Sequence, residues 1–262
     1  MYLVDYIQGV WKNRYILLSL VKRDLQTKYR RSNLGVAWSI LTPLGLALIV
    51  GFVYSVLFGT NPKEFIPLLF ASINPWLFMS GTADGATGSF LGAEGYIKQS
   101  TVSAQIFPLK LTLVNMVNLL YSIMAFFTIY LFLMPDKFGA SMLAFIPGLV
   151  IMFIFTLGFA NITAVVNLSI RDYQPLQSLV FQGLFYATPI IFPADMLREK
   201  GYEIVFQVNP FYYMLEVVRR PMLGNGLPSW RVYLVAISFA VVIFTLGIIV
   251  VMRAKKTLVY KL

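Results

Sequence analysis

Few side chains in this sequence are suited to acid, base or metal chemistry. The 262 residues include neither cysteine nor histidine, which excludes disulfides, Cys/His metal sites and a histidine acid or base. No glycine is followed by lysine, so the chain lacks the phosphate-binding loop GxxxxGK[ST] and cannot hydrolyse ATP by that route. A pair of carboxylates for glycosyl or acyl transfer would have to meet in one pocket, whereas only Asp84 of the eleven acids lies well inside an apolar segment. We therefore expect no catalytic residue, no metal site and no bound cofactor, and a membrane glycosyl- or acyltransferase is a weak alternative.

Asp84 has two interpretations. An ionisable residue inside a membrane span is a candidate functional residue, because its charge is costly there unless it meets water or a partner. It lies about nineteen residues into its apolar segment, however, so it could also simply reach the cytoplasmic headgroups. Four asparagines also fall inside apolar segments, and we expect them to hydrogen-bond between helices rather than bind a ligand. They are Asn115, Asn118, Asn161 and Asn167.

The elements that carry these residues are predicted to span a membrane. Hydrophobic residues make up 58% of the chain and charged residues 12%, which is membrane composition. Apolar runs of roughly 20 residues recur, each long enough to cross about 30 Å of hydrocarbon as a helix. We predict an all-α membrane protein with six transmembrane helices. They occupy about 35–58, 66–89, 109–133, 143–168, 175–192 and 231–252.

The first thirty residues are basic and amphipathic, and they show no signal peptide. Leu3, Ile7, Val10 and Trp11 share one helical face, which is typical of a helix that lies in the membrane interface. We therefore divide the chain into an interfacial helix over 1–33 and a six-span domain over 34–262.

Six crossings place both termini on one side of the membrane. The proposed inner side carries fourteen of the 21 basic residues, so the positive-inside rule makes both termini cytoplasmic. The net charge of +10 is then explained by loops that face anionic headgroups, and we expect no nucleic-acid partner.

Two segments depart from the simple pattern of apolar spans. The second span ends in small, polar and acidic residues from Gly81 to Ser89, a surface that should face another helix or water. The stretch 194–229 is too charged to span, and we expect short, half-immersed helices there. Asn209 followed by Pro210 gives one of them an N-cap and a proline at the first helical position.

Three motifs carry a resemblance to a known family. They are RRSNLGVAWSILTPL at 30–44, NLSIRDY at 167–173 and NPFYYMLEVVR at 209–219. Together they resemble the ABC transporter permeases that export O-antigen, capsule and teichoic-acid polymers, over essentially the whole chain. A drug or lipid efflux permease of the same architecture is the alternative.

The resemblance implies a homodimer in the bacterial inner membrane, with two copies of a separate cytoplasmic ATPase that bind ATP and Mg. It also implies a channel at the dimer interface for a lipid-linked polysaccharide, whose pyrophosphate could meet Arg30 and Arg31 beside Trp38. The two arginines could equally be positive-inside anchors among the membrane lipids. The family's coupling segment corresponds to Glu94, Tyr96, Lys98 and Gln99, with Arg171 and Asp172. Its outer gate corresponds to the two short helices between Ala194 and Gly224, and to Asn209, Pro210, Phe211, Tyr212 and Tyr213.

Overall fold

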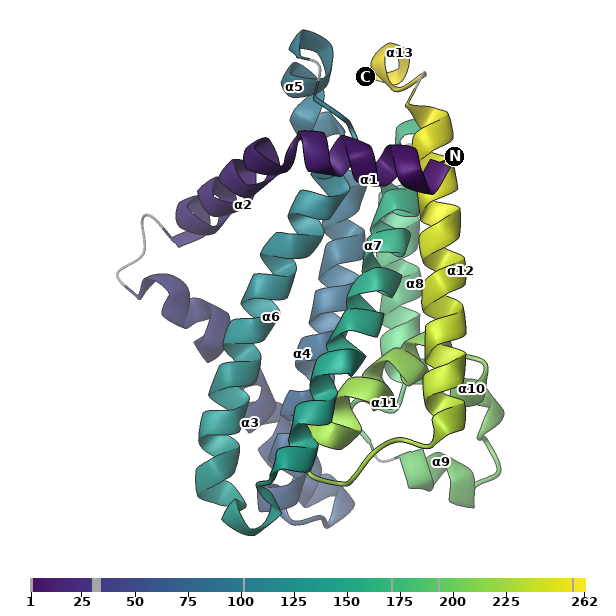
Figure 1. The fold of residues 1–262 in the computed structure, drawn as a ribbon. Coiled ribbons are helices and arrows are strands. Elements are labelled where there is room, and N and C mark those ends of the chain that lie inside the picture. Colours follow the sequence, from purple (N-terminus) through teal and green to yellow (C-terminus); the bar gives the residue numbers. More distant parts are fainter. Residues whose placement is uncertain (1, 30–33, 101, 171, 193, 256) are drawn as a thin grey trace.

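The protein is a long helical bundle, and its first two helices lie across one end of the bundle (Figure 1). The computed structural model describes residues 2–29, 34–100, 102–170, 172–192, 194–255 and 257–262. Every regular element within these ranges is a helix, which confirms the predicted all-α class.

Five helices are long and apolar enough to cross a membrane. They are α3 (Trp38–Phe58), α4 (Pro62–Thr87), α6 (Ile106–Leu133), α7 (Phe145–Ser169, preceded by a 3₁₀ turn over Ala140–Ala144) and α12 (Trp230–Ala254). Their bounds lie within a few residues of the predicted spans.

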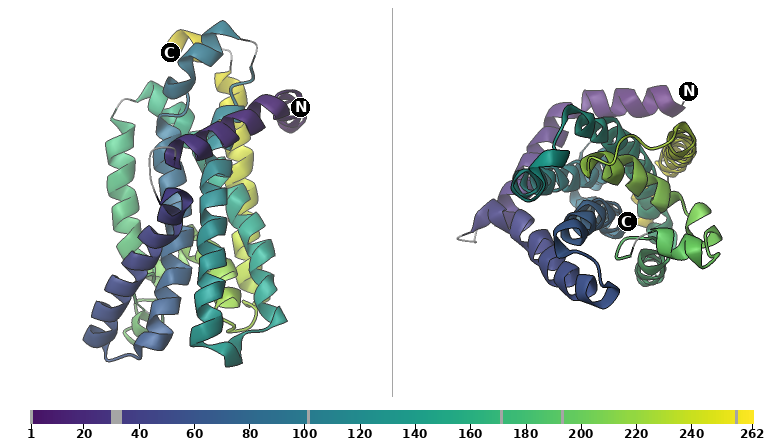
Figure 2. Two further views of the ribbon diagram at one scale, coloured as in Figure 1. Left: turned by 90° about the vertical axis from the view of Figure 1, so that its left-hand side faces the viewer. Right: turned by 90° about the horizontal axis from the view of Figure 1, so that it is seen from below.

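The predicted fifth span at 175–192 is shorter in the structure. Its helix α8 (Tyr173–Ala187) has 15 residues, fewer than the about 20 that a full crossing needs. The apolar run continues, but Pro189 cannot continue the helix and forces Thr188 into an extended conformation (φ −98°, ψ 135°). The segment still runs along the bundle, beside α4 and α7 (Figure 2), so a short sixth helix accompanies the five full-length ones.

The N-terminal segment forms two helices instead of the single predicted one. Helices α1 (Tyr2–Lys12) and α2 (Arg14–Tyr29) meet at Asn13. Both lie across the end of the bundle (Figures 1 and 2), and the short C-terminal helix α13 (Leu258–Lys261) lies at the same end. The two termini are therefore on one side, as an even number of crossings predicts.

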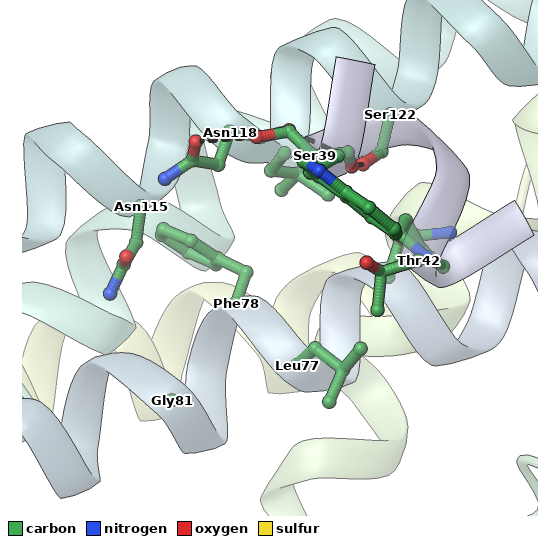
Figure 3. Close-up of a pocket in the computed structure, with 12 residues that line it drawn as sticks. Ser39, Thr42, Leu77, Phe78, Gly81, Asn115, Asn118 and Ser122 are labelled. Atoms are coloured by element: carbon green, nitrogen blue, oxygen red, sulfur yellow. Dashed lines mark hydrogen bonds between the residues drawn. The ribbon is translucent and has the colours of Figure 1, made fainter. Parts of the chain in front are cut away.

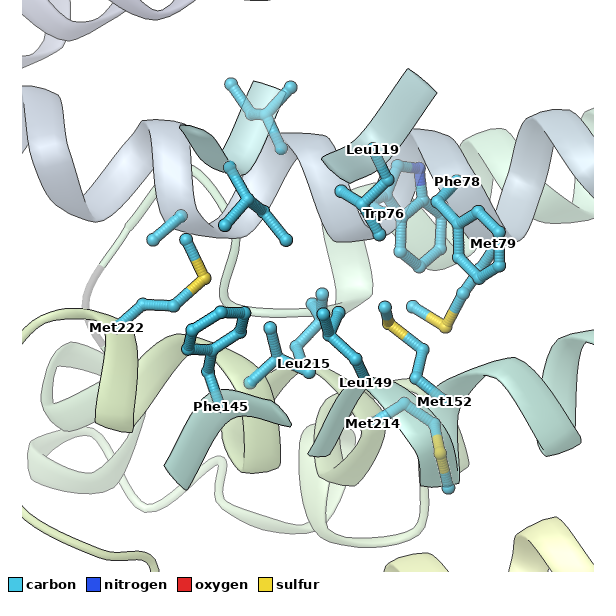
Figure 4. Packing of buried hydrophobic residues seen from close by; sticks show 14 of the residues in the cluster. Trp76, Phe78, Met79, Leu119, Phe145, Leu149, Met152, Met214, Leu215 and Met222 are labelled. Carbon is cyan, nitrogen blue, oxygen red and sulfur yellow. The ribbon is translucent and has the colours of Figure 1, made fainter. Parts of the chain in front are cut away.

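Helix α4 is at the centre of the main apolar core. Trp76, Phe78 and Met79 of α4 pack with Met152 of α7 and with Met214 of α11 (Pro210–Met222) (Figure 4). Side chains of this size bury enough apolar area to fix α11 inside the bundle.

Two helices of the bundle, α7 and α12, cross with their backbones in close contact. A Cβ atom added at Gly158 would lie 2.5 Å from the Cα and N atoms of Phe244, and Gly247 packs against the Gly158 carbonyl. Small residues at a crossing let two membrane helices approach this closely.

Candidate functional site

One side of α4 exposes small and polar residues. Gly81 and Gly85 are exposed, Asp84 is half-buried, and a Cβ atom at Gly81 would meet nothing within 4 Å. Residues three and four apart share a helix face, so these positions form one continuous surface. The left view of Figure 2 looks onto this side, with α8 on one flank of α4 and α6 on the other. Gly81, Gly85 and Gly88 are thus exposed, whereas Thr82, Ala83, Ala86 and Thr87 of the same segment are buried in the bundle.

A groove of about 350 Å³ lies between α3, α4 and α6 (Figure 3). Apolar side chains such as Leu77, Phe78 and Leu119 form much of its wall, and we call it the polar groove for the hydroxyls and amides that also line it. Ser39 Oγ donates to Asn118 Oδ1 at 3.2 Å, and Ser122 Oγ donates to the Ser39 carbonyl at 3.0 Å. Asn115 Nδ2 donates to Thr82 Oγ1 at 3.0 Å. The interhelical role expected for Asn115 and Asn118 is confirmed, and both side chains also line the groove.

The expected interhelical bonds of Asn161 and Asn167 are present as well. Asn161 Nδ2 donates to the Tyr6 hydroxyl at 3.3 Å, which joins α7 to α1. Asn167 Nδ2 donates to the Thr87 carbonyl at 2.9 Å, which joins α7 to the end of α4.

Helix α8 continues the polar surface on the other flank of α4. The Asp84 carboxylate accepts hydrogen bonds from Gln177 Nε2 at 3.0 Å and Ser178 Oγ at 3.2 Å. Gln174 and Gln182 are exposed on the same face of α8 as Ser178, at a spacing of four. Sequence reasoning missed these glutamines, although their spacing within an apolar segment was a usable signal.

We call this combined surface the polar face. It consists of Ser39, Thr42, Gly81, Asp84, Gly85, Asn115, Asn118, Gln174, Ser178 and Gln182. Its groups are hydroxyls, amides and open backbone, with a single carboxylate, and the described residues contain no group of acids able to hold a metal ion. Hydroxyls and amides both donate and accept hydrogen bonds, so the polar face suits a neutral, hydroxyl-rich ligand or water.

The expected entrance residues are only partly described. Trp38 begins α3, is 50% exposed and lines the polar groove, whereas Arg30 and Arg31 lie outside the described residues. The helices before them have two opposite faces. An exposed apolar stripe runs along Val4, Ile7, Trp11, Tyr15 and Leu18, and a buried stripe runs along Tyr6, Asn13, Leu17 and Leu20. These helices therefore have an apolar exposed face, and their place in the membrane interface stays a prediction.

Polar contacts attach α1 to the bundle. Gln105 Nε2 donates to the Tyr6 carbonyl at 3.2 Å, and Asn13 Nδ2 donates to Ser103 Oγ at 3.1 Å. Tyr6 is 4% exposed. Burial raises the pKa of its hydroxyl to about 12, although the hydrogen bond from Asn161 lowers it.

The expected coupling residues project from the same end of the bundle. Glu94, Tyr96, Lys98 and Gln99 belong to the short helix α5 (Glu94–Gln99), which protrudes beyond α1 and α2 in Figure 1. Lys98 Nζ pairs with Glu94 Oε1 at 2.7 Å, and Tyr96 Oη accepts a hydrogen bond from Arg23 Nη1 at 3.0 Å. Asp172 precedes α8 at this end, and Arg171 lies outside the described residues.

The expected outer-gate residues lie at the opposite end, and most of them are buried. Asn209 caps α11, because its side chain accepts from Phe211 N at 3.0 Å, and Pro210 is the first helical residue. Phe211 is 5% exposed and packs against Trp76 and Phe181 at ring distances of 5.5 and 5.3 Å.

Tyr212 is also buried, and burial raises its pKa to about 12. Tyr213 donates to the Gln207 carbonyl at 2.8 Å. The segment holds three helices where two were predicted: α9 (Ala194–Glu199), α10 (Ile204–Gln207) and α11. Helix α11 is buried among α4, α7 and α12 instead of half-immersed, because its apolar residues pack into the main core.

A buried ion pair holds α11 in place, and sequence reasoning missed it. Arg219 pairs with Glu216 one turn earlier, and its Nη1 donates to the Pro189 carbonyl at 2.6 Å and to Ser72 Oγ at 3.2 Å. Arg219 is 6% exposed and thus joins α11, α4 and the turn after α8. The i, i+3 spacing of an acid and a base in an apolar helix was the available signal.

Comparisons with known proteins place this architecture in a family. The ABC-2 type transporter family matches residues 15–223, about four fifths of the chain. The O-antigen export system permease protein RfbA of Klebsiella pneumoniae is 27% identical over 231 residues, which cover 88% of each chain. RfbA of Myxococcus xanthus is 24% identical over 229 residues, which cover 87% of each chain. The chain therefore belongs to the ABC-2 type transporter family, in which a separate ATPase subunit handles ATP, and is the inner-membrane permease subunit of an exporter.

Proposed function

We propose that this permease exports a lipid-linked, O-antigen-like polysaccharide, and that the passage forms where two copies of the chain bring their polar faces together. The observation that carries the proposal is the polar face. The O-antigen export activity named for the relatives supports the choice of substrate.

The polar face is unsuited to contact with lipid tails. Amide, hydroxyl and carboxylate groups in hydrocarbon lose their hydrogen bonds to water, and each unsatisfied group costs several kcal/mol. Only some of these groups have partners among the described residues, since Gln174 and Gln182 are exposed. A second copy, with water between the two, would satisfy the remaining groups.

The same chemistry fits a sugar polymer in transit. Sugar hydroxyls exchange hydrogen bonds with amides and hydroxyls on nearly equal terms, so the polymer can move without being held at one point. Trp38, at the edge of the groove, offers an aromatic surface for the apolar faces of sugar rings. Arg30 and Arg31, just before it, are proposed to meet the lipid pyrophosphate at the entrance.

The energy source in this proposal is a pair of ATPase subunits at the end of the bundle that carries α5. We propose that this end is cytoplasmic, that Glu94, Lys98 and Gln99 contact the ATPase, and that Arg171 and Asp172 support the contact. The hydrogen bond from Arg23 to Tyr96 would then pass movement of α5 to the entrance helices. At the far end, residues 209–213 on α11 are proposed to shape the outer gate.

The experiment is deletion of the gene in its own host, followed by complementation. Labelled sugar is followed in surface polymer and in lipid-linked polymer inside the cell. Three variants accompany the intact chain: Gln182→Leu and Gly81→Leu on the polar face, and Val241→Leu on the exposed apolar face of α12. Immunoblots of membranes verify equal amounts of each protein.

We expect deletion to remove surface polymer while lipid-linked polymer accumulates inside. The intact chain and Val241→Leu should restore surface polymer, and the two polar-face variants should restore it poorly. Unchanged surface polymer after deletion would refute the polysaccharide assignment and favour drug or lipid efflux. Full activity of both polar-face variants would refute the passage at this face.

A further inference from the structure

A second cavity, of about 240 Å³, lies where α2 meets the end of α4, the base of α5 and the first turn of α6. It is separate from the polar groove and contains none of the residues proposed for sugar passage except Gly85 at its edge. Its distinctive lining residues are Arg23, Gly88, Ser89, Gly92, Tyr96 and Lys110.

The cavity carries a net positive charge. Lys110 Nζ pairs with Asp24 Oδ2 at 2.6 Å, and Arg23 Nε lies 3.7 Å from Asp24 Oδ1. Two cations therefore share one carboxylate. The neighbouring Glu94 and Lys98 pair with each other and add no net charge. One positive charge remains for a ligand.

A buried hydroxyl in the cavity has no partner among the described residues. Ser89 Oγ is closed to solvent and makes no hydrogen bond, although the Ser89 backbone N–H donates to Ala86 O at 3.1 Å. Leaving a buried polar group unsatisfied costs about 1–3 kcal/mol, so such a group indicates a missing partner.

Glycines provide room for that partner. A Cβ atom at Gly92 would meet nothing within 4 Å, and one at Gly88 would meet only the Gly85 carbonyl at 4.0 Å. The wall on this side is therefore bare backbone, next to the unpartnered Ser89 hydroxyl.

We propose that this cavity binds the phosphate of a lipid headgroup, with Arg23 and Lys110 as the cations and with Ser89 as the hydroxyl donor once its side chain has rotated about Cα–Cβ to turn Oγ toward the cavity. A phosphodiester carries one negative charge, which matches the one free positive charge. Helix α2, which forms one wall, exposes Tyr15 and Leu18 in the apolar stripe. A lipid whose phosphate lies in the cavity can therefore rest its tails beside α2 in the membrane.

Two lipids carry this chemistry: an anionic membrane phospholipid, and the polyprenyl diphosphate that anchors an exported polymer. The phospholipid source is independent of the proposed function, whereas the polyprenyl source rests on it. Binding is therefore measured on the purified permease without any export assay, and failure of the site would leave the result of the deletion experiment unaffected.

The permease is purified in dodecyl maltoside micelles, which contain no phosphate, and titrated with phosphatidylglycerol, polyprenyl diphosphate or diacylglycerol, and bound lipid is counted by native mass spectrometry. We expect both phosphate lipids to bind and diacylglycerol, which lacks the phosphate, to bind at background level. Tighter binding of phosphatidylglycerol assigns the site to a membrane lipid, and tighter binding of polyprenyl diphosphate assigns it to the carrier.

Three variants test the residues. Ser89→Ala removes a hydroxyl that has no partner in the chain, so it should not harm folding, and it should weaken phosphate binding about tenfold. Arg23→Gln should weaken binding at least as much, whereas Asp24→Asn should tighten binding several-fold because it frees Lys110. Arg253→Gln, an exposed arginine in the last turn of α12 that does not line the cavity, is the matched control and should leave binding unchanged.

The direction of the Asp24→Asn effect separates a ligand site from a structural ion pair, because a structural role predicts only loss of stability. Equal binding of diacylglycerol and the phosphate lipids would overturn the proposal. Unchanged binding in both Ser89→Ala and Arg23→Gln would also overturn it.

Discussion

Replacing Gly158 by alanine should strongly destabilise the bundle. The new methyl group would lie 2.5 Å from the Cα of Phe244 and 2.6 Å from the carbonyl carbon of Ile243, whereas ordinary contacts are 3.4–4 Å. Helices α7 and α12 must therefore separate by about 1 Å, which forfeits a quarter to a half of the dispersion energy along their contact. Overpacking costs about 1–3 kcal/mol, and we expect the upper end because the obstacle is backbone.

The assay is thermal unfolding of the detergent-solubilised permease. A loss of about 3 kcal/mol corresponds to an unfolding temperature lowered by about 6–12 °C in a chain of this size. The control is Gly81→Ala, where the methyl group meets no atom within 4 Å and alanine favours the helix by about 1 kcal/mol. If Gly158→Ala unfolds at the same temperature as Gly81→Ala, the close crossing of α7 and α12 is refuted.

Three further predictions concern the polar anchors. Arg219→Met leaves Glu216 without its partner in a buried site and should lower the free energy of unfolding by about 3–5 kcal/mol. Adding Glu216→Gln should recover part of this loss. A double variant whose loss equals the sum of the two single losses would contradict the pairing. Asn209→Ala removes the cap of α11 and should lower the stability of the helix by about 1–2 kcal/mol. The loss should be measurable as faster proteolysis near residue 209, and an unchanged rate of proteolysis would count against the cap. The pKa of Tyr6 is about 12 in the folded chain against an ordinary value of 10.0 for tyrosine, so its contribution to stability is full below about pH 10 and is lost as the pH rises through about 12. Tyr6→Phe should remove this loss in unfolding temperatures measured across that range, and an unaltered pH profile would contradict it.

The membrane spans could be predicted because they depend on properties that can be read along the sequence. Length and apolar composition locate α3, α4, α6, α7 and α12, since each must cross the same thickness of hydrocarbon. The end of α8 was misplaced although its signal was present: Pro189 stops the helix, and the apolar residues after it pack without being helical.

Contacts between distant segments could not be predicted. The break at Asn13 is accompanied by a bond to Ser103, ninety residues away. The burial of Phe211 depends on Trp76 and Phe181, which come from two other helices. For Asp84 the sequence identified an unusual charge, but not the partners Gln177 and Ser178 that hold it. Sequence patterns indicate which residues need a partner, whereas only the packing of the helices supplies one.

The exposed surfaces of the bundle differ in the surroundings that they can tolerate. Helix α3 exposes Ile49, Phe52 and Val56, which lipid tails can cover without cost. The polar face exposes the side-chain amides of Gln174 and Gln182, which lipid tails cannot satisfy. Membrane helices associate through polar and close-packed contacts because the hydrophobic effect does not draw them together within lipid. In the proposed function the groups that suit a sugar would therefore also be the groups that draw two copies together, and we expect loss of the passage and loss of the dimer to follow from the same substitutions.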